Sequence, residues 1–236
     1  TYKNKELYLM PRKKKQEEIE ETEAVEETET AEEAEEVQEI QPEAVPFVFN
    51  MPMIEELPAK KSPKIVTVYG DIDEERCFEA LKGLLLYKSD YCEESQELLD
   101  PVQMYISTWG GSAPDMFSVY DLIRSMRGKV PVHTIGLGKV MSAGVVLLAS
   151  GEKGHRKIGA NCRVMFHGVQ AGHAGTIFNL ENEMEEAKWT QERYIKALVK
   201  ETNMSLGYLK KLIDRKLNVY FSAEEAVELG IADEII

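Results

Sequence analysis

The stretch formed by residues 136–151, GLGKVMSAGVVLLASG, constrains the fold of this chain more than any other. Its apolar run, residues 145–149, is far shorter than the roughly 20 residues that a membrane-spanning helix needs. We therefore expect a buried helix that begins close to Ser142. A buried helix needs a sizeable core around it, and a chain of 236 residues is long enough to form one domain with such a core.

Ser142, at the start of this helix, has two interpretations. As an N-cap, its hydroxyl would accept a hydrogen bond from a backbone N–H of the first helical turn. As a nucleophile, it would use the free N–H groups and the dipole of the helix to stabilise developing negative charge. The stretch alone leaves both interpretations open and favours the cap.

From Lys64 onward, strand-like segments alternate with helix-like segments. The content of β-branched and aromatic residues predicts strands over residues 65–69, 102–107, 131–135, 163–167 and 219–221. Apolar periodicity predicts further helices over residues 73–87, 115–126, 176–202, 206–215 and 223–229. Such alternation is typical of an α/β fold in which the strands pair mostly in parallel.

The first 63 residues have no pattern that could pack into a core. Fourteen Glu and no Lys, Arg or aromatic residue lie between Glu17 and Glu43. Low hydrophobicity with charge of one sign predicts a disordered acidic tail over residues 1–63, followed by one domain over residues 64–236. An apolar island at residues 47–54 is either a docking segment or a strand at the domain edge.

Charge and cysteine usage exclude several function classes. Residues 1–63 hold 17 acidic and 8 basic side chains, against 25 and 20 in the remainder, so no basic stripe for nucleic acid is present. Cys77, Cys92 and Cys162 lack the spacing of metal ligands and predict reduced thiols and no metal site. Without a recognisable signal segment or membrane span, we expect a cytoplasmic protein with no membrane partner.

Four features of the predicted domain could form one chemical site. In chain order they are Gly110-Gly111 after a strand, Ser142, His167 at a strand end, and either Asp214 or Asn218. Loops at the carboxyl ends of parallel strands are where α/β proteins place their sites. An anion-binding turn, a nucleophile, a base and a group that orients the base are the parts of a serine hydrolase. The site is not the α/β-hydrolase elbow, because Val140 stands where that motif has Gly.

These residues occur in blocks that resemble a known family. The blocks are YISTWGG at residues 105–111, MSAG at 141–144, RVMFH at 163–167 and FSAEEA at 221–226. From Lys64 to Ile236 the chain resembles the proteolytic subunit of the Clp protease, ClpP, a serine peptidase of the ClpP/crotonase fold. The resemblance implies an α/β fold of repeated ββα units with a protruding strand–helix handle, made by residues 168–175 and the helix over 176–202.

The resemblance also assigns roles. It makes Ser142 the nucleophile and His167 the general base, and the backbone N–H groups of Gly111 and Ala143 the oxyanion hole. The position of the triad aspartate is Asn218, and Asp214 is a possible substitute acid. An amide can fix the imidazole tautomer but stabilises imidazolium poorly, and one well-studied Asp→Asn change costs about 10⁴-fold in rate.

The implied function is that of a serine endopeptidase cutting unfolded polypeptides without a cofactor. Its implied partners are further copies in stacked rings, either of one kind of subunit or mixed with a related one, and an AAA+ ATPase unfoldase. Asn218 leaves a second hypothesis open, a catalytically weak or inactive ring subunit. A third is a dedicated ClpP-type protease, such as a viral head-maturation protease. A crotonase acting on acyl-CoA shares the fold, but it has no need for the Ser142–His167 pair.

Overall fold

The structure is a computed structural model that describes residues 63–91 and 99–236. The chain divides into two units after Leu57, and every described residue belongs to the second, Pro58–Ile236. The acidic tail, the apolar island and Cys92 lie outside the described residues, so what the sequence predicts for them stays a prediction.

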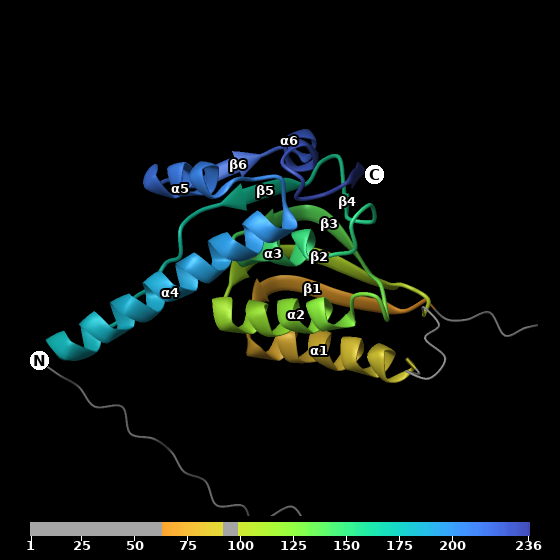
Figure 1. Ribbon diagram of the computed structural model, residues 1–236, viewed down its shortest axis with the longest axis horizontal. Coiled ribbons are helices and arrows are strands. Elements are labelled where there is room, and N and C mark those ends of the chain that lie inside the picture. Colours follow the sequence, from red (N-terminus) through yellow and green to blue (C-terminus); the bar gives the residue numbers. More distant parts are fainter. Residues whose placement is uncertain (1–62, 92–98) are drawn as a thin grey trace, which may run out of the picture. The chain divides into compact units, whose positions relative to one another are not determined.

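The second unit is built on a sheet whose strands are mostly parallel (Figure 1). The described strands are β1 (Ile65–Ile72), β2 (Val102–Gly111), β3 (Val132–Met141), β4 (Lys157–Ile158), β5 (Arg163–Phe166), β6 (Val219–Phe221) and β7 (Glu234–Ile235). Their order is β1-β2-β3-β4-β7, with β5 paired to β3 and β6 paired to β5. Every pair is parallel except β5–β6. The predicted α/β fold is confirmed.

Helices follow the strands as the alternation predicts. They are α1 (Glu74–Ser89), α2 (Ala113–Met126), α3 (Ala143–Ala149), α4 (Ile177–Glu201), α5 (Leu206–Asp214) and α6 (Ala223–Glu228). Side chains cap the N-termini of these helices. At α1, Asp73 accepts a hydrogen bond from the Arg76 N–H at 2.9 Å, and at α6, Ser222 forms a capping box with Glu225. Helices α1 and α2 lie side by side next to β1 in Figure 1, and α3 contacts both β2 and β3.

The sheet buries one face of its long strands against these helices. In β1, Val66 and Val68 are buried while Tyr69 is 71% exposed, as the two-residue period of a strand requires. All seven residues of α3 are buried, which confirms the predicted central helix. Cys77 and Cys162 are free and buried, and burial raises the pKa of each thiol to about 11, so both stay protonated at neutral pH.

Three strands, β1, β2 and β3, end later in the chain than the sequence predicts. The prediction that the first strand ends at residue 69 is wrong, because the strand absorbs a bulge between Gly70 and Asp71 and continues to Ile72. Past the bulge, Ile72 is still paired with Gly111, so the glycine pair expected as a turn after β2 forms the end of that strand.

Helix α4 is the feature that protrudes from the body. Its first half extends away from the sheet in Figure 1, and its buried residues all lie at or after Tyr194. The helix of the expected handle is therefore present. Residues 168–175, expected as the handle's strand, form no strand and pair with no other described segment as a ladder. Among the described helices, none combines the length and the apolar content needed to cross a membrane.

Candidate active site

Ser142 lies at the junction of β3 and α3 in an uncommon backbone conformation. Its φ is 53° and its ψ is −122°, a region that non-glycine residues rarely adopt and that costs about 1–3 kcal/mol. The Ser142 N–H donates to the Met165 carbonyl of β5 at 2.7 Å, which holds the junction against the neighbouring strand. The neighbouring strand β5 thus holds a strained serine in place at the start of a buried helix.

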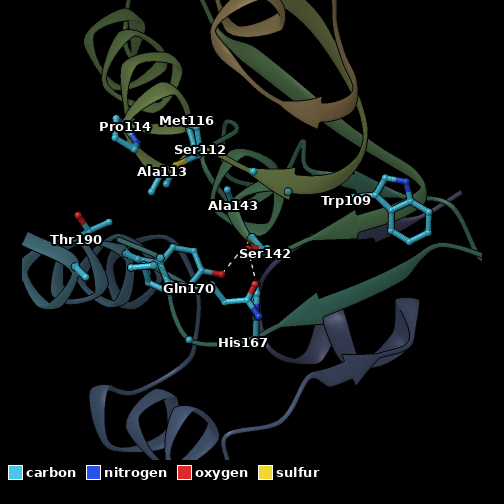
Figure 2. Close-up of a pocket in the computed structure, with 18 of the residues that line it drawn as sticks. Trp109, Ser112, Ala113, Pro114, Met116, Ser142, Ala143, His167, Gln170 and Thr190 are labelled. Carbon is cyan, nitrogen blue, oxygen red and sulfur yellow. Dashed lines mark hydrogen bonds between the residues drawn. The ribbon is translucent and has the colours of Figure 1, made fainter. Parts of the chain in front are cut away.

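The hydroxyl of Ser142 does not cap α3. No N–H of the first turn donates to it, so the cap interpretation is wrong. Its Oγ lies 2.7 Å from Nε2 of His167, within hydrogen-bond distance (dashed line in Figure 2). Of the two interpretations, the geometry supports the nucleophile, because a serine in this position needs a base at this distance.

His167 follows the last residue of β5 and faces the start of α3. Burial lowers its pKa below the ordinary value of 6.5, so the imidazole is neutral at neutral pH and able to accept a proton. Its other ring nitrogen, Nδ1, has no hydrogen-bond partner among the described residues. The base is therefore positioned by its backbone and its burial, without a third group bonded to the ring.

The two candidates for the third group lie in different places. Asn218 lies just before β6 and lines the same cavity as Ser142 and His167, but it makes no hydrogen bond to the ring. Asp214, the last residue of α5, lines a separate groove between α4 and α5 together with Lys188 and Lys210. The structure thus brings Asn218 into the site and leaves Asp214 outside it.

Two glycines shape the wall beside the serine. A Cβ on Gly110, whose φ is +96°, would lie 2.5 Å from Cβ of Ser142. A Cβ on Gly111 would lie 2.2 Å from the Ile72 carbonyl oxygen. Because both residues are glycines without a Cβ, the end of β2 can approach the serine closely. Ala143, the first residue of α3, has an N–H without an intrahelical acceptor, as the start of a helix dictates.

These groups line one cavity, which has a volume of about 780 Å³ (Figure 2). Trp109 and Met116 lie on its walls with Thr190 of α4, and Gly111 and Ala143 line it next to the serine. Among the described residues, its lining holds the carboxylates of Asp71, Glu183 and Glu186 and no Lys or Arg, so the field of these residues favours neutral or cationic ligands. Glu183 is paired with His173, with 2.9 Å between Oε2 and Nε2.

The sequence did not indicate every residue of the site. Tyr194 of α4 donates its hydroxyl to the Ser142 carbonyl oxygen at 3.0 Å, yet the sequence indicated only that it belongs to the helix predicted over residues 176–202. Met116 and Thr190 carry no motif at all. Within the described residues, no three His, Cys, Asp or Glu side chains come together as a group that could hold a metal ion.

The arrangement can perform nucleophilic chemistry. A neutral imidazole 2.7 Å from a serine hydroxyl can remove its proton as the oxygen attacks an electrophilic carbon. Backbone N–H groups near the start of α3 are suited to the negative charge that develops on the attacked group.

A family model and three known proteins that resemble this chain all bear the name of one protease. The family model for "Clp protease" matches residues 60–236. The ATP-dependent Clp protease proteolytic subunit of Deinococcus radiodurans is 32% identical over 173 residues, which span 73% of this chain and 80% of that protein. Proteolytic subunit 4 of Rhodococcus jostii is 30% identical over 173 residues, spanning 73% of this chain and 84% of that protein. Proteolytic subunit 1 of Salinibacter ruber is 33% identical over 143 residues, spanning 61% and 60%.

Proposed function

The chain belongs to the Clp protease family, and from this membership we propose that it is a serine endopeptidase that hydrolyses backbone amides of unfolded polypeptides. The observation that carries the proposal is the 2.7 Å contact between Oγ of Ser142 and Nε2 of His167, made by a serine whose hydroxyl caps nothing.

In the proposed reaction, Oγ of Ser142 attacks the carbonyl carbon of the scissile amide while Nε2 of His167 takes the hydroxyl proton. The N–H groups of Gly111 and Ala143 stabilise the oxyanion. The imidazolium then gives its proton to the leaving amine, and an acyl-enzyme remains on Ser142. A water molecule, deprotonated by the same imidazole, releases the acyl group and restores the hydroxyl.

Asn218 has a limited part in this scheme. As a side chain of the same cavity, it can orient the imidazole through its amide oxygen when substrate closes the site, but it carries no charge to stabilise imidazolium. Asp214 lines another groove and would need a rearranged α5 to act as the acid. The expected consequence is an activity well below that of an enzyme with a carboxylate in this position.

We further propose that the domain over residues 64–236 assembles with further copies, or with a related subunit, into rings that enclose the sites. An AAA+ ATPase unfoldase would supply the polypeptide. The relatives are named as proteolytic subunits of an ATP-dependent protease, which supports this assignment. Large apolar side chains exposed on the protruding half of α4 support an assembling surface, among them Ile177, Phe178 and Met184.

A second candidate function is that of a ring subunit with little or no activity. The unpartnered Nδ1 of His167 and the amide at residue 218 favour it. The retained contact between Ser142 and His167 argues against it.

Labelling by a fluorophosphonate probe tests these proposals on the full chain. We expect slow labelling of the wild type, none of Ser142→Ala, and faster labelling of Asn218→Asp. Labelling only of Asn218→Asp would support the inactive subunit. No labelling of the wild type or of Asn218→Asp, in protein shown to be folded and assembled, would refute the peptidase proposal.

A further inference from the structure

Tyr194 connects the two elements that carry the reactive pair. Its side chain comes from α4 and is only 4% exposed. Its hydroxyl donates to the Ser142 carbonyl oxygen at 3.0 Å. Its ring stacks on Phe166, the residue before His167, with 5.6 Å between centroids and 8° between planes.

The hydrogen bond acts on a particular peptide group. The Ser142 carbonyl and the Ala143 N–H belong to the same planar peptide, so the direction of one fixes the direction of the other. That N–H is one of the two donors of the proposed oxyanion hole. A hydrogen bond accepted by the carbonyl also polarises the peptide and makes its N–H a stronger donor.

We infer that Tyr194 is a positioning residue for the oxyanion hole, holding the Ser142–Ala143 peptide so that its N–H faces the reacting oxygen. The inference rests on the proposed peptidase function. Tyr194 does not touch the reacting atoms and acts through the peptide alone.

Two further features of the site support this role. Ser142 has a strained backbone, and a strained peptide keeps its orientation only when its surroundings hold it in place. Only two donors reach the Ser142 carbonyl among the described residues: Tyr194 and the Val145 N–H at 3.0 Å, which belongs to α3 itself. Burial raises the pKa of Tyr194, so its hydroxyl stays protonated and remains a donor at every pH at which the enzyme would work.

A merely structural role would predict something different. Removal of any buried hydroxyl leaves its acceptor without that partner and lowers stability, whether or not the hydroxyl lies near the site. Tyr120 offers the matched case: it is buried, its hydroxyl donates to Oε1 of Glu201 at 2.9 Å, and it does not line the catalytic cavity. The two Tyr→Phe changes each remove one buried hydroxyl and leave the ring.

The test is the rate of fluorophosphonate labelling as a function of probe concentration, on the full chain. In this reaction Oγ of Ser142 bonds to phosphorus, fluoride leaves, His167 takes the proton, and the phosphoryl oxygen occupies the oxyanion site. The maximal rate and the half-saturating concentration are measured for the wild type, Tyr194→Phe and Tyr120→Phe, with the thermal midpoint of each.

For Tyr194→Phe we expect the maximal rate to fall about tenfold with the half-saturating concentration unchanged, a smaller loss than the 10²–10³-fold measured when an oxyanion donor is deleted. For Tyr120→Phe the rate stays within twofold of the wild type, although both variants lose some stability. Tyr194→Met, which fills the space with a flexible apolar side chain, should lose at least as much rate as Tyr194→Phe.

The other outcomes separate the two proposals. Tyr194 has no positioning role if wild type is labelled at Ser142 and Tyr194→Phe keeps its rate, raises only the half-saturating concentration, or slows no more than Tyr120→Phe. If Tyr194→Phe does not fold, a folded Tyr194→Met with wild-type rate has the same meaning. If the wild type is not labelled at all, the peptidase function fails, and the inference fails with it.

Discussion

At the scale of single residues, the site depends on a serine in a conformation that few side chains adopt. In its strained conformation, Ser142 lies so close to the end of β2 that only a glycine fits at position 110. A Cβ on Gly110 would lie 2.5 Å from Cβ of Ser142. The reactive hydroxyl therefore caps no helix N–H and instead lies 2.7 Å from Nε2 of His167.

His167 determines the pH dependence that we expect. Burial lowers its pKa, and only the neutral ring can take the proton of Ser142, so the labelling rate should rise with pH through a midpoint below 6.5. In Asn218→Asp a carboxylate beside the ring would favour imidazolium, and the midpoint should move to higher pH. Labelling rates measured between pH 4.5 and 8.5, in buffers of constant ionic strength, give these midpoints.

Asp214→Asn serves as the control for this pH series. Asp214 lines the groove between α4 and α5, so removing its charge should leave the midpoint unchanged. A midpoint shifted to lower pH in Asp214→Asn would show that this carboxylate reaches the imidazole and is the acid of the site.

At the scale of elements, the close docking of α3 on β2 depends on Gly144. A Cβ at this position would lie 2.3 Å from Cγ2 of Thr108, a fully buried and β-branched residue that cannot easily move aside. We expect Gly144→Ala to lower the free energy of unfolding by about 1–3 kcal/mol, the usual cost of overpacking, despite the helix preference of alanine.

Gly207→Ala is the matched control for Gly144→Ala. Gly207 lies in α5, has no neighbour within 4 Å of an added Cβ and has no positive φ. This change should be neutral or raise stability by about 0.4–1 kcal/mol. Urea unfolding at equal protein concentrations measures both, and a Gly144→Ala variant as stable as Gly207→Ala would contradict the proposed packing.

The sequence predicted the bounds of helices and strands better than it predicted the contacts between them. Apolar periodicity predicted α1, α2 and α4 to within a few residues, because each of these helices covers a core with one face. The sequence missed the continuation of β2 through Gly110 and Gly111, which depends on pairing with β1 across a bulge. It also missed the hydroxyl of Tyr194, whose partner lies 52 residues away. Contacts between distant segments leave no local pattern.

At the scale of the whole molecule, a buried cluster of charges connects segments that are far apart in the chain. The carboxylate of Glu201, at the end of α4, is buried and accepts hydrogen bonds from Arg124 and Arg127 at the end of α2. Arg156 donates to the Glu201 backbone carbonyl at 2.7 Å and pairs with Asp233 near the C-terminus. A buried carboxylate is tolerated only with such partners, so this cluster anchors the C-terminal end of α4 in the body.

The direction of α4 bears on the proposed assembly. Its first turn presents Ile177 and Phe178, which are 73% and 77% exposed, and the buried part of the helix begins only at Tyr194. Exposed apolar side chains of this size are typical of protein–protein contacts. We expect the double change Ile177→Asp and Phe178→Asp to convert the assembled protein into smaller species, because charged side chains cannot be buried unpaired in a contact between copies.

Sedimentation velocity of the full chain at several concentrations measures this effect. Lys210→Asp, which changes the charge of an exposed residue of α5, is the control and should sediment like the wild type. Circular dichroism should show the same helix content for all three proteins, since neither change touches the core. A wild type that stays monomeric at every concentration would contradict the ring proposal. An assembled double variant would instead exclude the first turn of α4 from the contact, and the assembling surface would then have to be sought elsewhere on the domain.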